Sequence, residues 1–336
     1  MDNSKIRTID KKKLHKDILK VIIATAVFYV GLFCFPKKVD LEINYLQEHT
    51  ELPQAVNTGI HKKVIDALQV QTGAVKLSTI SHHNSAKLAL LQAISKRKQN
   101  IRKKFQFTCK ESPVYCKIID FHGVKKYEQQ ILYVKLTETI GNFMVKYQKF
   151  GKPILSVLKK IDILNKKGSP RAYASWSKIT MHGQSIKNYK EYFNLVGHEI
   201  GHVMDLGAIH GVAKEKHKFF TEFGNENFEI DDPSLSYYAI SWVDEQTRKE
   251  TMDQQHFCSR YGMSNPFEDF AECHNLYLNH NNMFVFMAKR NEALKAKYNF
   301  MANLYGGKYL FDDKNYITML SMKPERRAWD TTKLYK

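Results

Sequence analysis

The stretch "LVGHEIGHVMDLGAIHG" (195–211) places two histidines four residues apart, with a glutamate directly after the first. In an α-helix, His198 and His202 lie one turn apart on the same face, so both imidazoles can reach one metal ion. Glu199 lies about 100° around the helix axis, where it misses the ion but can reach a coordinated water. The stretch therefore predicts a helix that carries two zinc ligands and a general base.

Two histidines do not complete a catalytic zinc site, because such a site has three protein ligands and one open position. The H-E-x-x-H-x-x-G-x-x-H pattern would need glycine at position 205 and histidine at position 208. The chain has Asp205 and Ala208 there, and the nearby His210 is out of register. The third ligand therefore has to come from another part of the chain.

The segment "SRYGMSNPFEDFAECHNLY" (259–277) contains the better candidate. Asn265 can cap a helix whose first position is Pro266. Glu268 and Glu272 then lie one turn apart on the same face of that helix. Two interpretations remain open. In the first, Glu268 is the third zinc ligand and Glu272 orients a histidine, or Glu272 replaces Glu268 as the ligand. In the second, Asn265 and Glu268 only form a capping box.

Together, "HEIGHVMD" and "YGMSNPFEDFAE" resemble the gluzincin metallopeptidases of the anthrax-lethal-factor-like and Pro-Pro endopeptidase group. The resemblance implies one Zn²⁺ per chain, bound by His198, His202 and Glu268. It also implies that Glu199 is the general base and that Tyr261 polarises the substrate carbonyl oxygen. A phenol donor aimed at a developing oxyanion is sound chemistry in itself, and a packed aromatic side chain before a helix is the alternative for Tyr261.

The resemblance covers roughly 170–280 and is specific only at the two motifs. The interval between His202 and Glu268 is longer than is usual in this group, which indicates an insertion within 207–257. The sequence therefore does not define which residues cover the cleft or which substrates it accepts. Asp205 follows His202 at the end of the helix, where it can hydrogen-bond a ligand histidine or face solvent.

The stretch "AYASWSKITM" (172–181) precedes the motif helix and is rich in β-branched and aromatic residues. In relatives, the corresponding strand binds peptide as an additional strand, and any edge strand offers the same main-chain pairing. The candidate substrate-binding residues are Tyr173, Ser175, Trp176 and Ser177. Gly197 and Gly201 inside the expected helix indicate the close approach of another element, which we expect to be this strand.

The N-terminus has the character of a membrane anchor. Residues 1–20 carry seven Lys/Arg and three acidic residues, and the uncharged stretch "VIIATAVFYVGLFCF" (21–35) follows. We expect an uncleaved signal-anchor at 18–35, with the N-terminus in the cytoplasm and the catalytic domain on the other side of the membrane. A cleaved export signal followed by secretion is the alternative, although the small residues that precede a cleavage site are missing.

Four cysteines follow the apolar segment, namely Cys109, Cys116, Cys258 and Cys273. They could form two disulfide bonds, as in exported proteins, or remain four free and buried thiols. Cys109 and Cys116 would close a short loop, and Cys258 and Cys273 flank much of the third-ligand segment. Their spacing is not that of a zinc finger.

The formal charge of +18 favours anionic surroundings, such as a membrane surface, an envelope polymer or a nucleic acid. The charge is spread over many single lysines, so a lysine-rich soluble surface explains it equally. The basic cluster at 96–104 has no interleaved aromatic residues on which bases could stack. We therefore expect no specific nucleic-acid partner, and the sequence does not indicate an oligomeric state.

The apolar periodicity predicts helices over 127–166, over 189–206 and from about residue 265. A strand that ends in a glycine turn is expected at 172–183. The 43% of apolar residues in this chain of 336 are enough for a substantial core.

We expect an α+β protein whose zincin-like catalytic domain (126–336) combines a small mixed sheet, the active-site helix and a second ligand helix. A basic tail (1–20), the transmembrane segment (18–35) and a juxtamembrane helical region (36–125) precede it. The expected function is that of a zinc endopeptidase acting on proteins or peptides. The alternatives are a non-catalytic, zinc-containing envelope or host-surface binding module, and a basic nucleic-acid or membrane-associated factor in which the motif is accidental.

Overall fold

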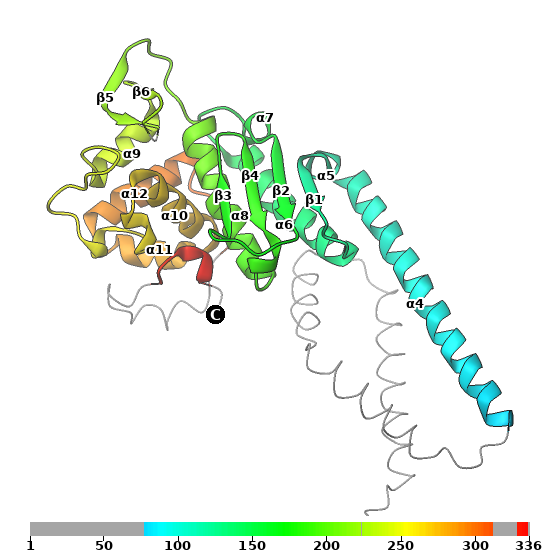
Figure 1. Ribbon diagram of the computed structural model, residues 1–336. Helices are drawn as coiled ribbons and strands as arrows, with labels where there is room; N and C mark the ends of the chain where they lie inside the picture. Colours follow the sequence, from blue (N-terminus) through cyan, green and yellow to red (C-terminus); the bar gives the residue numbers. More distant parts are fainter. Residues whose placement is uncertain (1–76, 223, 312–327, 335–336) are drawn as a thin grey trace, which may run out of the picture. The chain divides into compact units, whose positions relative to one another are not determined.

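The computed structural model describes residues 77–222, 224–311 and 328–334, and Figure 1 shows their arrangement. Residues from Leu90 onward form one compact unit, which contains the whole four-stranded sheet described below. The expected basic tail and membrane segment lie outside the described residues. Among the helices that are described, none has the length and apolar character needed to cross a bilayer.

A four-stranded mixed sheet, in the order β1-β2-β4-β3, lies at the centre of this unit. The strands are β1 (Ile119–His122), β2 (Lys160–Leu164), β3 (Ala172–Ala174) and β4 (Lys178–His182). β1, β2 and β4 run parallel, and β3 pairs antiparallel with β4 at one edge. An α+β architecture with a small mixed sheet is therefore confirmed, and the sheet begins at Ile119, ahead of the expected domain start at 126.

Two of the expected elements were wrong in detail. The helical prediction over 127–166 holds for α6 (Tyr127–Tyr147) and for the short α7 (Ile154–Val157), but the chain then enters strand β2. The β2 sequence "KIDIL" has only three apolar residues in five positions, too few for periodicity to separate a helix from a strand. The single strand expected at 172–183 is instead the β3–β4 hairpin, which turns at 175–177.

Helix α8 (Tyr189–Val203) carries the H-E-x-x-H motif and packs between the sheet and α10 (Pro266–Asn279). It begins where the Asn188 side chain accepts a hydrogen bond from the Glu191 backbone N–H at 2.9 Å. It continues into a π-helical turn, Met204–Ala208. A Cβ on Gly201 would lie 3.0 Å from the Ala271 Cα, so the close neighbour of this glycine is α10 and not the strand that we expected.

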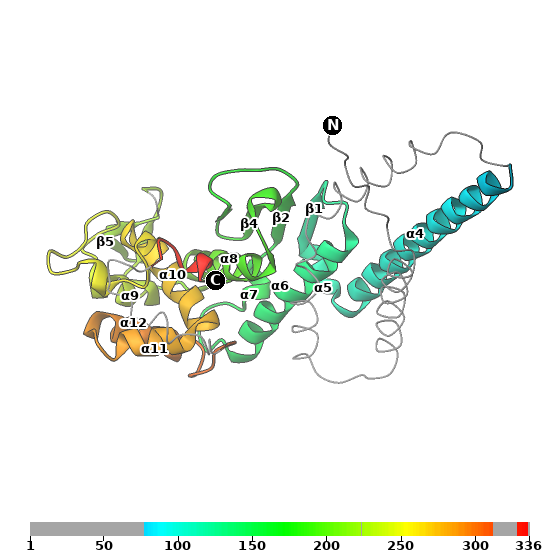
Figure 2. The same cartoon turned by 90° about the horizontal axis from the view of Figure 1, so that it is seen from below.

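Three further helices of the unit lie on the far side of α8 from the sheet, as Figures 1 and 2 both show. They are α9 (Pro233–Ser241), α11 (Asn281–Ala288) and α12 (Glu292–Leu304). The insertion between the two motifs contains α9 and the hairpin of β5 (Lys216–Thr221) and β6 (Asn227–Glu229).

Two disulfide bonds join all four of the cysteines that follow the apolar segment. Cys109 in α4 (Leu77–Glu111) bonds to Cys116 in α5 (Pro113–Ile118). Cys258 bonds to Cys273 and ties the loop before the second ligand helix to that helix. Of the two interpretations left open by the sequence, the structure has the disulfide-bonded form.

Candidate metal centre

α8 and α10 bring two imidazoles and one carboxylate together. The Oε2 atom of Glu268 lies 3.2 Å from the Nε2 atom of His198 and 3.4 Å from the Nε2 atom of His202. A tetrahedral zinc ion with bonds of about 2.0–2.1 Å keeps its ligand atoms about 3.3 Å apart. The three residues form a possible metal-binding group, and the spacing of their ligand atoms fits zinc.

Glu268 serves as a helix-start residue through its backbone and as part of the metal group through its side chain. The Asn265 side chain accepts a hydrogen bond from the Glu268 backbone N–H at 2.8 Å. The Glu268 carboxylate meanwhile faces the two histidines. The capping and ligand interpretations are therefore compatible, because they use different atoms of one residue.

Glu272 is fully buried behind the metal group, where it holds a histidine and does not join the group itself. Its Oε1 atom lies 2.9 Å from the Nδ1 atom of His198, and its Oε2 atom accepts a hydrogen bond from the Thr331 backbone N–H at 2.6 Å. A carboxylate on Nδ1 turns the opposite ring nitrogen toward the metal position.

Glu199 and Tyr261 lie beside this group. Glu199 is 3% exposed, burial raises its pKa, and no hydrogen-bond partner of its Oε2 atom is found among the described residues. The Tyr261 hydroxyl donates to Glu268 Oε1 at 2.9 Å, and its ring stacks on His198 with the ring centroids 6.3 Å apart. Burial and the Glu268 carboxylate raise the pKa of this phenol, so it remains a proton donor at neutral pH.

Asp205 has neither of the two environments considered from the sequence. It is fully buried, so it does not end the helix in solvent, and its Oδ2 atom accepts a hydrogen bond from the Tyr238 hydroxyl at 2.6 Å. Within the described parts of the chain, no hydrogen bond joins it to His198 or His202. The expected role of Asp205 in orienting a ligand histidine is therefore wrong; the π-helical turn directs its side chain into a different pocket.

The candidate substrate-binding residues lie on and next to the edge strand. Tyr173, in β3, and Trp176, in the turn that follows, are each half-exposed. The backbone N–H of Ser175 donates to the Lys178 carbonyl at 2.8 Å, and the Ser177 carbonyl accepts from the Lys159 N–H at 2.7 Å. Both serines thus shape the turn through their main chains, while the two aromatic side chains remain accessible.

Two parts of the site's surroundings could not be recognised in the sequence. Trp329 and Thr331 lie in the C-terminal segment 328–334, which has no motif, yet the Trp329 carbonyl accepts from the Tyr261 N–H at 2.7 Å. His274 lies buried next to α8, with its Nδ1 atom 2.8 Å from the Gly197 carbonyl oxygen. The one available signal for His274 was its place on the same helix as Glu268.

The comparisons with known proteins agree with this geometry. Residues 179–312 match a family model. Its description is "Putative zinc-binding metallo-peptidase". The matched residues include α8, α10 and the whole possible metal-binding group. No match was found among curated proteins or among solved structures. The family match supports zinc binding and peptidase activity in general, and it does not distinguish the lethal-factor-like group.

Proposed function

We propose that this protein is a zinc-dependent endopeptidase. The observation that carries the proposal is the position of Glu268 Oε2, 3.2 Å and 3.4 Å from the Nε2 atoms of His198 and His202, which fits one tetrahedral ion. Among the described residues, no fourth ligand belongs to this group. A site with three protein ligands keeps one position open for water or substrate, as catalytic zinc sites do. The family match over residues 179–312 supports the same conclusion.

Each side chain around the site would have a separate role in peptide hydrolysis. When bound, Zn²⁺ lowers the pKa of a coordinated water to about 7 and polarises a carbonyl oxygen. Glu199 accepts the proton of the attacking water and passes it to the leaving amine. Tyr261 donates its hydroxyl to the oxyanion that develops on the substrate. Glu272 holds His198 in the orientation that the site requires.

We propose that the substrate binds as an additional strand along β3. This strand is the last in the sheet order, so one of its edges has no partner strand within the described sheet. An extended peptide can pair with such an edge through its main chain and place alternate side chains in pockets. The half-exposed Tyr173 and Trp176, with Ser175 and Ser177 in the turn, would then border the peptide.

We also propose that the catalytic unit works outside the cytoplasm, anchored to the membrane by residues 18–35. The two disulfide bonds support this location, because such bonds persist in oxidising compartments. Secretion after cleavage of the N-terminal segment is the alternative. Fractionation of expressing cells, followed by sequencing of the mature N-terminus, separates the two.

The test of the enzymatic proposal is the substitution Glu199→Gln in the full chain. We expect the variant to retain one zinc per chain, because Glu199 is not in the metal group. We expect kcat to fall by about 10²–10⁴-fold, the usual contribution of a general base. Metal analysis and digestion of an unbiased peptide library measure the two quantities.

The control and the contrary outcomes are equally specific. His202→Ala should lose both zinc and cleavage. Unchanged cleavage by the Glu199→Gln variant would refute the assigned base. Stoichiometric zinc in the wild-type protein without cleavage of any library peptide would indicate a non-catalytic zinc module.

A further inference from the structure

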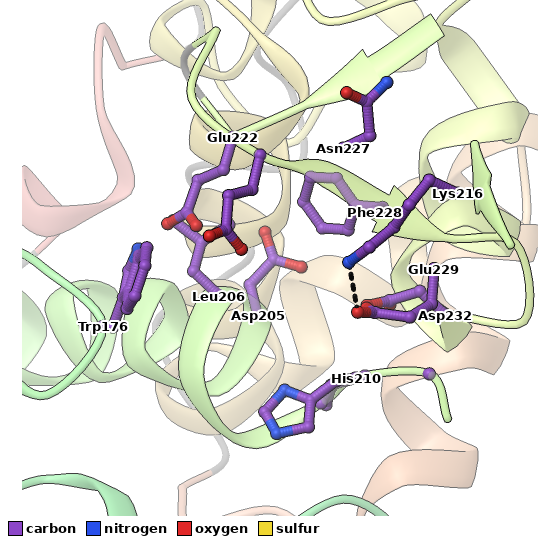
Figure 3. Close-up of a pocket in the computed structure, with 13 residues that line it drawn as sticks. Trp176, Asp205, Leu206, His210, Lys216, Glu222, Asn227, Phe228, Glu229 and Asp232 are labelled. Carbon is purple, nitrogen blue, oxygen red and sulfur yellow. Dashed lines mark hydrogen bonds and ion pairs between the residues drawn. The ribbon is translucent and has the colours of Figure 1, made fainter. Parts of the chain in front are cut away.

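An acidic pocket of about 250 Å³ lies beside the turn that follows β3 (Figure 3). Three parts of the chain line it: Trp176 of the β3–β4 turn, the π-helical turn with Asp205, and the β5–β6 hairpin with the loop after it. Trp176 is half-exposed, and its indole lies beside Glu222. The pocket thus begins where the proposed substrate strand would leave the edge of the sheet.

The pocket holds more negative charge than the chain itself neutralises. Its carboxylates are those of Asp205, Glu222, Glu226, Glu229 and Asp232. Among the described residues that line it, Lys216 is the only lysine or arginine, and its Nζ atom lies 2.5 Å from Glu229 Oε1. Burial raises the pKa of Glu222 to about 7 and that of Asp232 to about 6, as expected for carboxylates without a cation beside them.

Asp205 adds a buried carboxyl group to the pocket. The residue is fully buried, and Figure 3 shows its carboxylate directed into the pocket. Its Oδ2 atom accepts from Tyr238 at 2.6 Å, and the Ser234 side chain also lies close to the carboxyl, whose pKa burial raises well above its usual range. A ligand with N–H donors can bond this carboxyl group from the pocket side.

The pocket is too wide for a bare metal ion. Wherever the structure describes the chain, only two groups place three possible ligand atoms within 4.8 Å of one another. One is the metal centre, and the other, Asp120 with His122 and Asp162, lies on the sheet. The pocket carboxylates form no such group, so an extended cation with several donors suits them better. A guanidinium group can also lie on the indole face of Trp176.

We propose that this acidic pocket binds a basic side chain of the peptide substrate, arginine in preference to lysine. The proposal rests on the proposed function, because it assigns the pocket to a peptide that runs along β3. Arginine carries a planar fork of N–H donors, so it can bond two carboxylates at once. A lysine ammonium does this less well. The substrate class is therefore peptides with a basic residue at one fixed distance from the cleaved bond.

The test compares arginine with citrulline, its neutral and nearly isosteric analogue. The library digest locates the position at which basic residues are enriched, and two peptides are made that differ there only. We expect kcat/KM for the arginine peptide to exceed that for the citrulline peptide by about 10–100-fold, the range for a hydrogen-bonded charged group. Glu222→Gln should reduce this ratio at least fivefold, because it lowers kcat/KM for the arginine peptide more than for the citrulline peptide.

Glu215→Gln is the matched control, because Glu215 is exposed, just precedes β5 and does not line the pocket. It removes the same charge and should leave the ratio unchanged. The proposal would be overturned if no position of the library showed enrichment of basic residues, or if both variants reduced the arginine-to-citrulline ratio equally. Cleavage of the library would still support the peptidase function in either case.

A binding measurement separates failure of the pocket from failure of the enzyme. Fluorescence titration of the full-length Glu199→Gln variant with the two peptides reports affinity without turnover. Tighter binding of the arginine peptide by about tenfold or more supports the pocket independently of the roles assigned to the catalytic residues. Equal affinities overturn the proposal. So does Ca²⁺ binding that is lost in Glu222→Gln without any arginine preference, because the pocket would then be an ion site.

Discussion

At the residue scale, two side chains of the metal group, those of His198 and Glu268, each have a second polar atom held by a fixed neighbour. The Nδ1 atom of His198 faces Glu272, and the Oε1 atom of Glu268 accepts from Tyr261. The i, i+4 spacing in the sequence was enough to predict that Glu272 lies near Glu268 on one helix face. It could not predict that the Thr331 backbone N–H holds Glu272 in turn, because 59 positions separate the two residues.

Protonation of His274 should make the free energy of unfolding depend on pH. Its Nδ1 atom lies 2.8 Å from the Gly197 carbonyl oxygen, and its Nε2 atom lies 2.6 Å from the Tyr305 hydroxyl. The neutral ring satisfies both, with Nδ1–H as donor and Nε2 as acceptor. Burial lowers the pKa of His274 to about 4.

Lowering the pH from about 6.5 to about 4 should therefore reduce the free energy of unfolding through His274. In this interval the unfolded ring takes up a proton and the folded ring does not, so stability is present above the unfolded pKa and falls below it. The loss from this group is on the order of 3 kcal/mol. Urea unfolding at several pH values, with a chelator present so that metal loss does not contribute, measures it. In His274→Gln the slope should be shallower, and identical slopes would contradict the assignment.

At the scale of elements, the two motif helices could be predicted from local signals. The apolar periodicity and the histidine spacing predicted α8, and Asn265 followed by Pro266 predicted the start of α10. The strands lacked such signals. β2 has only five residues and β3 only three, so their identity depends on pairing with other strands. The sequence analysis expected the strand to be the close neighbour of Gly201, whereas the neighbour is α10. This contact could not be predicted either, because it joins distant parts of the chain.

The packing of α10 against α12 depends on a buried ion pair. Lys297 and Asp269 are both fully buried, with the Lys297 Nζ atom 2.7 Å from Asp269 Oδ2. Trp242 donates to the same carboxylate at 3.0 Å, and Lys297 donates to the His256 carbonyl at 2.9 Å. A buried pair with all of these bonds holds one arrangement of the helices in place.

Lys297→Met should lower the free energy of unfolding by about 3–5 kcal/mol, because it leaves the Asp269 charge buried without its cation. The double variant Lys297→Met/Asp269→Asn should recover much of this loss, because no uncompensated charge remains. Chemical denaturation of the wild-type protein and both variants gives the three free energies. A single variant that is destabilised by less than about 1 kcal/mol would show that the pair is dispensable.

At the scale of the whole molecule, the C-terminal segment 328–334 returns to the site and joins several elements. Arg171, just ahead of β3, donates to Asp330 Oδ2 at 3.1 Å and also pairs with Glu191 of α8. Thr331 contacts α10, where it accepts a hydrogen bond from Asn275 at 2.9 Å. No pattern in the sequence could reveal this, because the Arg171–Asp330 contact spans 159 positions and uses ordinary surface residue types.

A chain that ends at residue 327 should lose activity even where it still folds. Truncation removes the backbone donor to Glu272 and the carbonyl partner of the Tyr261 N–H, so both His198 and the oxyanion donor become less well oriented. Loss of such supporting contacts typically costs 10–100-fold in metal affinity or activity. We therefore expect kcat and zinc affinity each to fall by about 10–100-fold, with a smaller change in KM. A chain that ends at Leu334 retains these contacts and is the control; full kcat and full zinc affinity in the shorter chain would mean that the segment only covers the site.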